Sequence, residues 1–210
     1  LHSYFNYPFT IQSFIRGHGQ GVFVLFDRGE AVCFFAHRRL REKPPAGGVS
    51  VLSESASVPE PLKKHAENLL RPLNWHGVAM IEFRISEDGT GYLMEINPRF
   101  WGSLQLAVDA GVDFPWLLYL ACMGKTLPKT QVRHRRLRWL LGDLDRLYVV
   151  FKSSSSEYPL RKKVLEFLRF FKPNRRTKHE VNRVNDLSPC WFEIKQYIRA
   201  LKRREQKIRW

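Results

Sequence analysis

Hydrophobic and polar positions alternate on both sides of the dipeptide Asp88-Gly89. Alternation with a period of two is typical of a β-strand, and Asp-Gly between two such runs predicts a hairpin. A two-residue turn at this dipeptide would place Glu82 directly opposite Glu95. Because side chains alternate between the faces of a strand, Asn97 would share their face. The other face would carry apolar side chains for a core: Ile81, Phe83, Ile85, Met94 and Ile96.

The remaining pattern predicts three more strands and several helices. Strands are expected at residues 9–15, 22–26 and 31–36, and a hairpin at residues 27–30 joins the last two. Apolar residues at helical spacing predict helices at residues 61–73, 104–110, 114–123, 142–151, 159–171 and 190–208. The glycine-rich residues 16–21 are expected to form a flexible turn beside the site. The predicted class is α+β: a mainly antiparallel sheet with flanking helices, followed by a helical tail.

The two facing glutamates need a partner. Carboxylates paired across a hairpin lie about 4.5–5.5 Å apart at Cβ, and like charges there are destabilising. Mg²⁺ takes oxygen ligands and is commonly held by one or two carboxylates together with substrate phosphates. Arg99 has the same parity as Asn97 and could contact a phosphate or carboxylate oxygen. The alternative is an ordinary surface hairpin whose glutamates pair with Arg84 in water.

The sequence Glu-x-Asn-Pro-Arg after an apolar strand, opposite a second glutamate, resembles the C-terminal subdomain of ATP-grasp enzymes. The likeness is to the carbamoyl-phosphate synthase large subunit, biotin carboxylase and carboxylate–amine ligases, over about residues 10–127. It implies that Glu82, Glu95 and Asn97 hold two Mg²⁺ ions, with Mn²⁺ as an alternative ion, on the phosphates of ATP. It also implies that Arg99 contacts phosphate or an acyl-phosphate intermediate.

The same resemblance assigns an adenine site. In ATP-grasp proteins a strand comparable to residues 9–15 links the two subdomains and lines the adenine, although Gln12 stands where the family usually has an acidic residue. Gln12, Ser13, Phe14 and Ile15 are therefore the predicted adenine contacts. The alternative is a plain core strand.

An arginine pair is assigned in the same way. Biotin carboxylase has a similar Arg-Arg pair at the point where residues 37–41 stand here, followed by a Pro/Gly loop beside the substrate. Arg39 or Arg41 is thus expected to hold an anionic substrate, since guanidinium groups suit carboxylate recognition. Arg39 and Arg99 are the predicted catalytic residues, and an exposed charge run is the alternative for residues 37–41.

These assignments predict an ATP- and Mg²⁺-dependent ligase. A substrate carboxylate would be activated as an acyl phosphate and attacked by an amine, or less readily by a thiol. The chain begins at Leu1 and shows no counterpart of the family's other ATP-clamping half, so it is expected to be part of a longer protein and to have little activity alone. The competing prediction is a non-catalytic ATP-grasp-like scaffold.

Charge divides the chain of 210 residues, whose formal net charge is +15. Residues through Lys125 carry 12 basic and 12 acidic side chains, whereas the rest carries 23 and 8. We therefore expect residues 1–127 to form the ATP-grasp part and residues 128–210 a basic, mostly helical extension.

The basic tail leaves three alternatives open. Its apolar stripes pack on the core with the charges in water, or it binds an anionic membrane surface or polyanion, or it binds nucleic acid. No nucleic-acid-binding module is visible, and the aromatic residues lie on packing stripes. Because no apolar run approaches the roughly 18–20 residues of a membrane span, a cytoplasmic protein is expected, peripheral at the membrane if the tail binds lipid.

Overall fold

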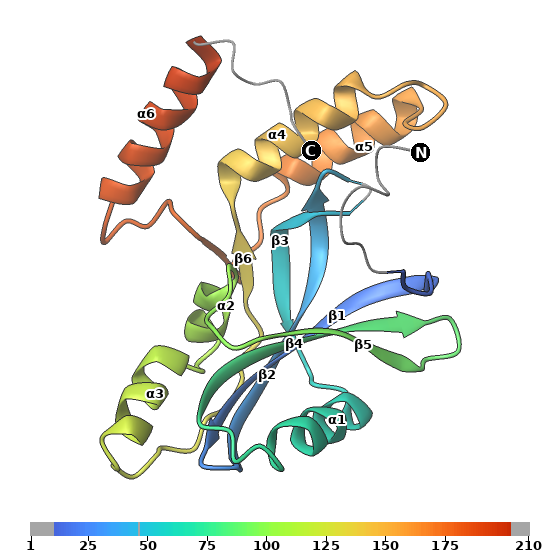
Figure 1. Cartoon of the computed structure of the whole chain (residues 1–210). Coiled ribbons are helices and arrows are strands. Elements are labelled where there is room, and N and C mark those ends of the chain that lie inside the picture. The colour runs from blue at the N-terminus through green and yellow to red at the C-terminus, as the bar shows by residue number, and fades with distance from the viewer. Residues whose placement is uncertain (1–10, 46, 203–210) are drawn as a thin grey trace, which may run out of the picture.

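The computed structural model describes residues 11–45 and 47–202 and has an α+β fold, as predicted (Figure 1). One seven-stranded sheet has the strand order β5-β4-β1-β2-β3-β6-β7. All neighbouring strands are antiparallel except β6 and β7. The strands are β1 (Gly17–Asp27), β2 (Glu30–Lys43), β3 (Val49–Ala56), β4 (Gly77–Ser86), β5 (Gly91–Asn97), β6 (Arg136–Arg138) and β7 (Thr177–His179).

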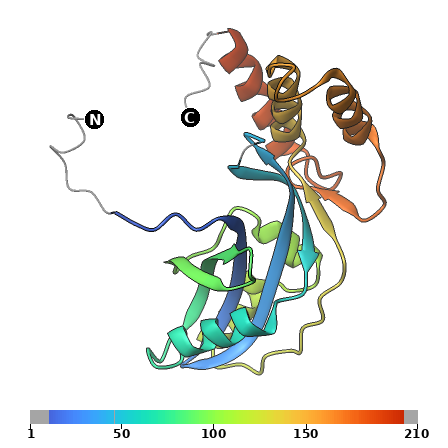
Figure 2. The same ribbon diagram turned by 90° about the vertical axis from the view of Figure 1, so that its right-hand side faces the viewer.

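Six helices surround this sheet in the described part of the chain: α1 (Glu60–Leu70), α2 (Leu104–Asp109), α3 (Phe114–Cys122), α4 (Leu140–Lys152), α5 (Leu160–Phe171) and α6 (Ser188–Lys202). Figure 2 shows α4, α5 and α6 gathered at one end of the sheet and α1 at the other. No helix within residues 11–45 and 47–202 combines the length and apolar character needed to cross a membrane.

Strand β1 is the centre of the core because both of its faces are covered. Val22, Val24 and Phe26 pack with α1, while Phe23 and Leu25 pack with α2 and α3. All five side chains are fully buried. The alternation along one strand thus supplies two hydrophobic clusters, one on each side of the sheet.

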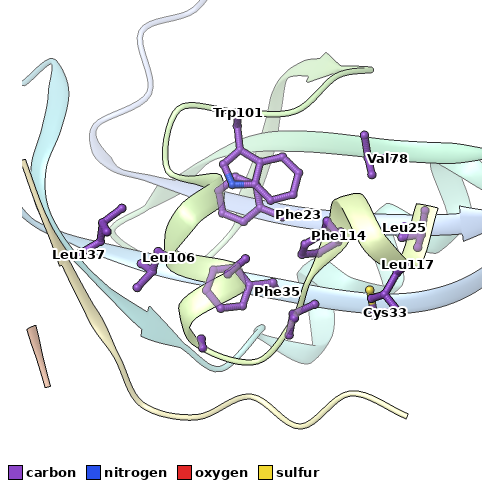
Figure 3. Close-up of a cluster of buried hydrophobic side chains, with 13 residues drawn as sticks. Phe23, Leu25, Cys33, Phe35, Val78, Trp101, Leu106, Phe114, Leu117 and Leu137 are labelled. Carbon is purple, nitrogen blue, oxygen red and sulfur yellow. The ribbon is translucent and has the colours of Figure 1, made fainter. Parts of the chain in front are cut away.

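Trp101 belongs to the hydrophobic cluster that β1 forms with α2 and α3, and it connects this cluster to the chain that follows β5 (Figure 3). Its ring stacks on Phe23 with centroids 4.3 Å apart and meets Phe114 edge-on at 5.0 Å. Asp113 accepts a hydrogen bond from the backbone N–H of Trp116 at 3.0 Å and so caps α3. These contacts fix the path of residues 98–103, which leave the predicted metal-binding strand.

The β4–β5 hairpin has a longer turn than predicted. Ser86 N donates to Thr90 O, and Gly89, whose φ of +87° suits glycine, donates to Ser86 O. The loop therefore has three residues instead of two. A bulge at Met94 then restores the predicted register, so that Glu82 does lie opposite Glu95. Because of the bulge, Met94 is 53% exposed, and its predicted place in the core is wrong.

Several predicted elements differ because their hydrogen-bond partners lie far away in sequence. Residues 11–16 form no strand, and residues 9–10 lie outside the described range. The glycine-rich stretch is not a flexible turn: from Gly17 onward it belongs to β1 and pairs with β4 along its length. Strand β3 was not anticipated. Helix α6 begins at Ser188, and residues 203–208 of the predicted last helix lie outside the described residues.

The tail contributes to the sheet as well as to the helices. β6 pairs with β3, and β7 pairs with β6, so two strands beyond residue 127 continue the sheet of the preceding part. The division of the chain near residue 127 stays a prediction. The apolar stripe of α5 does not pack on the core: Leu160, Leu168 and Phe171 are 74%, 60% and 64% exposed.

The buried position of Phe114 leads to a first prediction. Phe114→Ala should lower the free energy of unfolding by about 3–5 kcal/mol, because it opens a cavity beneath Trp101. Trp116→Ala, two residues further along the same helix but 52% exposed, should cost less than about 1 kcal/mol. Urea denaturation of both variants tests this, and equal losses would contradict the assignment of Phe114 to the core.

Candidate functional site

The predicted acidic pair lies together on one face of the sheet. Glu82 on β4 and Glu95 on β5 are register partners, so the backbone holds their side chains next to each other. Burial raises the pKa of the Glu82 carboxyl above its ordinary value, and the neighbouring Glu95 raises it further, against the lowering effect of Arg39. The carboxylates therefore face each other at an electrostatic cost, as the sequence predicted.

Asn97 and Arg99 extend this pair in a chain of contacts. Asn97 Nδ2 donates to Glu95 Oε1 at 2.7 Å, and Arg99 Nη2 donates to Asn97 Oδ1 at 3.3 Å. The other terminal nitrogen of Arg99 donates to the backbone oxygen of Phe100 at 3.1 Å. The amide thus connects an acidic and a basic side chain, and all three are at the cleft surface.

Arg39 on β2 contacts Glu82 of the acidic pair. Its guanidinium lies 3.4 Å from Glu82 Oε1 and 3.2 Å from Glu42 Oε1. In the strand order, β1 separates Arg39 on β2 from Glu82 on β4. On β1 the residues opposite Glu82 and Arg84 are Gly21 and Gly19, which have no side chains to fill the space between them. The glycine-rich sequence therefore leaves the surface open where Arg39 reaches across.

A bulge in β2 decides between the two candidate arginines. The register with β3 shifts between Arg39 and Arg41, so the two side chains are on opposite faces despite their even spacing. Arg41 instead pairs with the fully buried Asp143 of α4 at 2.9 Å. Of the two alternatives, Arg39 lies in the candidate site and Arg41 lies outside it, and the role of Arg39 in holding a substrate stays a prediction.

The sequence did not single out a second pair of polar residues, His37 and Ser103. His37 is buried in the cleft floor, where burial and the nearby Arg39 lower its pKa to about 3. Ser103 Oγ lies 2.9 Å from His37 Nδ1 and makes no side-chain hydrogen bond to cap α2. The signal was available, since His37 has the parity of Arg39 on the same strand.

Two clefts meet at the acidic pair. One, of about 610 Å³, is lined by Arg39, Glu82, Glu95, Asn97 and Arg99, and from the tail by Trp139, Glu180, Val181 and Glu193. The other, of about 510 Å³, is lined by Gln12, Gly19, Gln20, Arg84 and Met94 together with Arg39, Glu82 and Glu95. The pair is therefore accessible from both sides.

The predicted adenine contacts are only partly placed in these clefts. Gln12 lines the smaller cleft, whereas Ser13, Phe14 and Ile15 are not among the residues that line either one. Phe14 is 84% exposed, and the backbone oxygen of Ile15 accepts a hydrogen bond from Arg84 Nε at 3.1 Å. Their role at the adenine stays a prediction.

The donor set fits a hard divalent cation. Within residues 11–45 and 47–202 there is no group of three His, Cys, Asp or Glu side chains able to hold a metal by themselves. Two carboxylates and the Asn97 amide oxygen offer oxygen ligands only, which suits Mg²⁺ when substrate phosphates and water complete its shell.

Comparison with known proteins identifies the fold. The model of a family described as "ATP-grasp in the biosynthetic pathway with Ter operon" matches residues 7–140. The phosphoribosylaminoimidazole carboxylase ATPase subunit of Aquifex aeolicus aligns at a TM-score of 0.50 and 18% identity, over 59% of this chain and 40% of its own. No curated protein sequence matches the chain.

Two further solved structures align less well. The biotin carboxylase complex of Campylobacter jejuni has a TM-score of 0.48 and 15% identity, over 60% of this chain and 30% of its own. The L-amino acid ligase of Bacillus licheniformis has a TM-score of 0.39 and 23% identity, over 50% and 29%. The chain thus spans 40% or less of the length of each of these three proteins.

The raised pKa of Glu82 gives a prediction with a definite sign. Between the ordinary and the raised value the folded state binds more protons than the unfolded state, so wild-type stability falls as pH rises through that range. Without divalent ions, Glu82→Gln should therefore gain stability over wild type as pH rises from about 4 to 7, by up to about 1 kcal/mol.

Urea denaturation at several pH values measures this gain, and Glu87→Gln, in the exposed turn of the same hairpin, is the matched control. A stability difference for Glu82→Gln that did not change with pH would contradict the assigned repulsion.

Proposed function

The chain belongs to the family of ATP-grasp proteins in the biosynthetic pathway with the Ter operon. We propose that it is part of an ATP-dependent ligase that joins a carboxylate to an amine. One observation carries this proposal: the register-paired Glu82 and Glu95 lie where two clefts meet, with Arg39 and Arg99 on either side. An acidic pair flanked by guanidinium groups suits phosphate bound through a cation.

The two clefts suggest how the substrates are divided. In this proposal ATP occupies the smaller cleft, with its adenine toward Gln12 and its phosphates at Glu82 and Glu95. The carboxylate and the amine occupy the larger cleft, which Arg39 and Arg99 also line. The γ-phosphate then lies between the two, where a carboxylate oxygen can reach it.

The proposed reaction has two steps. A carboxylate oxygen bonds to the γ-phosphorus while the bond from that phosphorus to ADP breaks, which gives an acyl phosphate. The amine nitrogen then attacks the acyl carbon, loses a proton, and inorganic phosphate leaves. Mg²⁺ held by Glu82, Glu95 and Asn97 would supply charge neutralisation on the β- and γ-phosphates.

Two arginines and a neutral histidine of the chain would bind the substrates in this site. Arg99 is held by Asn97 and Phe100 beside the phosphate position, and its role is to neutralise charge on the transferred group. Arg39 binds the substrate carboxylate. His37, uncharged because its pKa is lowered to about 3, supplies a hydrogen-bonding group without adding charge in the cleft floor.

Two carboxylates from the tail favour an amine as the second substrate. Glu180 and Glu193 line the larger cleft, and Trp139 Nε1 donates to Glu193. Burial raises the pKa of Glu180, and the nearby Glu193 raises it further. A carboxylate of raised pKa both attracts a cationic amine and is able to take up the proton that the amine must lose.

Thermal unfolding with nucleotide tests the central assignment. An excess of about ten Kd of ATP stabilises a protein by about 1.4 kcal/mol, which for this size raises Tm by about 3–6 °C. With Mg²⁺ present the wild-type protein should show such a rise, and Glu95→Gln should lose at least half of it. The matched control Glu87→Gln should keep it.

One result of the thermal-unfolding experiment would contradict the assignment of Glu95 to the nucleotide site. A wild-type shift that is the same with Mg²⁺ and with a chelator, and is unchanged in Glu95→Gln, would favour a scaffold that binds nucleotide elsewhere.

The exposed stripe of α5 favours a second, additional function. Four apolar side chains of α5 are 44–74% exposed, and their spacing places them on one face of the helix: Leu160, Val164, Phe167 and Leu168. Arg161 and Lys162 are exposed on the same helix. Such a basic amphipathic helix suits an anionic membrane surface. We propose that the tail attaches the enzyme peripherally to anionic lipid.

Vesicle co-sedimentation tests this attachment. Binding to phosphatidylcholine vesicles that contain phosphatidylglycerol should weaken about tenfold or more in Leu160→Ser/Leu168→Ser, because two apolar side chains no longer enter the interface. Leu73→Ser/Trp116→Ser, which changes two exposed apolar residues outside the tail, should bind as wild type does. Equal binding by both double variants would contradict the assignment.

A further inference from the structure

A second polar cavity lies on the opposite face of the sheet from the candidate active site. It has a volume of about 680 Å³ and is walled by β2, β3, β6 and β7 together with α4 and α5. Figure 1 shows α4 and α5 side by side next to the end of β2 and the beginning of β3. Along β6 the faces are easily told apart, because Leu137 lines the active-site cleft while Arg136 and Arg138 line this cavity.

Nearly all of the charged residues that line the cavity are cations. Side chains from four separate segments converge on it: Arg41, Arg136, Arg138, Arg146, Arg169 and Lys172, with Glu166 as the one carboxylate in the lining described. Three of the arginines are largely buried, since the side chains of Arg41, Arg138 and Arg146 are 12%, 13% and 9% exposed. The lining is thus a built interior surface.

The protein's own carboxylates do not balance these cations. Arg41 and Arg138 share Asp143, at 2.9 and 2.7 Å. Arg146 and Arg169 share Glu166, at 2.8 and 3.0 Å. Each carboxylate therefore serves two guanidinium groups.

The fifth arginine is no better balanced. Arg136 lies 2.8 Å from Glu54, a carboxylate that also pairs with Arg38. The arginines therefore outnumber the carboxylates, and positive charge is left over in the cavity.

Two buried nitrogens of the lining that take part in no ion pair also lack a hydrogen-bond partner within the described part of the chain: Arg146 Nε, which is a donor, and His179 Nδ1. Burial lowers the pKa of Arg41, and the neighbouring Arg138 and Arg146 lower it further against the effect of Asp143, as expected where positive charge is in excess. Unpaired buried donors are costly, so a bound acceptor would stabilise this arrangement.

We propose that this cavity binds a small polyanion that carries phosphate groups. Several guanidinium forks converging from different elements suit phosphate oxygens, which accept paired hydrogen bonds from arginine. The concave shape and limited volume suit a small molecule rather than a polymer. Most of the lining lies beyond residue 140, outside the region that matches the family model.

Isothermal titration calorimetry with sodium tripolyphosphate, on the full chain without divalent ions, tests the site. Arg169→Gln/Lys172→Gln removes two cations whose side chains are at the cavity mouth, so it spares the buried arginines. We expect its affinity to fall by about tenfold or more, because each lost contact is a charge-assisted hydrogen bond. Arg161→Gln/Lys162→Gln removes the same charge from the exposed N-terminal part of the same helix and should stay within about twofold of wild type.

Other arms separate this site from the proposed active site and from general anion binding. Arg39→Gln/Arg99→Gln should leave tripolyphosphate affinity within about twofold, and citrate should bind more weakly than tripolyphosphate. Hydrogen exchange of the unaltered protein should show slower exchange in β7 and in the C-terminal turn of α5 when tripolyphosphate is added.

Four results would overturn the proposal. They are no heat of binding at millimolar tripolyphosphate, equal affinity in the two α5 double variants, loss of binding in Arg39→Gln/Arg99→Gln, and tighter binding of citrate. The proposal does not rest on the ligase activity, since none of its residues lines the candidate active site.

Discussion

The structure depends on one constraint, the register that holds Glu82 and Glu95 opposite each other on neighbouring strands. A three-residue turn would by itself have shifted the pairing by one residue, and the bulge at Met94 shifts it back. A slip of one residue would move an acidic side chain into the opposite cluster, beside α1. The electrostatic cost of the pair is therefore imposed by the backbone, and it is relieved by a proton on Glu82 or by positive charge from elsewhere.

The surrounding sheet keeps that pair accessible and in place. β1 first presents glycines where it passes between Arg39 and Glu82, and it is then buried on both faces where it carries Val22–Phe26. Trp101, stacked on Phe23, anchors the segment that carries Arg99. The tail adds β6 and β7 to the same sheet and supplies the acidic wall of the larger cleft. One rigid core thus supports both the proposed active site and the cationic cavity behind it.

The sequence predicted the acidic pair, Asn97 and the class of fold because these follow from local alternation and a turn dipeptide. It could not distinguish Arg39 from Arg41, since their spacing is that of one strand face and only the bulge against β3 separates them. The parity of His37 with Arg39 was visible in the sequence, but its contact with Ser103, 66 positions away, was not. The glycine-rich stretch likewise becomes a strand only by pairing with β4. Tertiary pairing of this kind leaves no periodic signal in a single sequence.

The central claim is that Glu82, Glu95 and Asn97 together hold a divalent cation. Mn²⁺ is the most direct probe, because it takes the same oxygen ligands as Mg²⁺ and scatters X-rays anomalously. A crystal of the protein soaked with MnCl₂ and a non-hydrolysable ATP analogue should give an anomalous difference peak within about 2.0–2.5 Å of oxygens from these side chains. A peak elsewhere, or Glu82 and Glu95 still in contact with no ion between them and the nucleotide, would contradict the account.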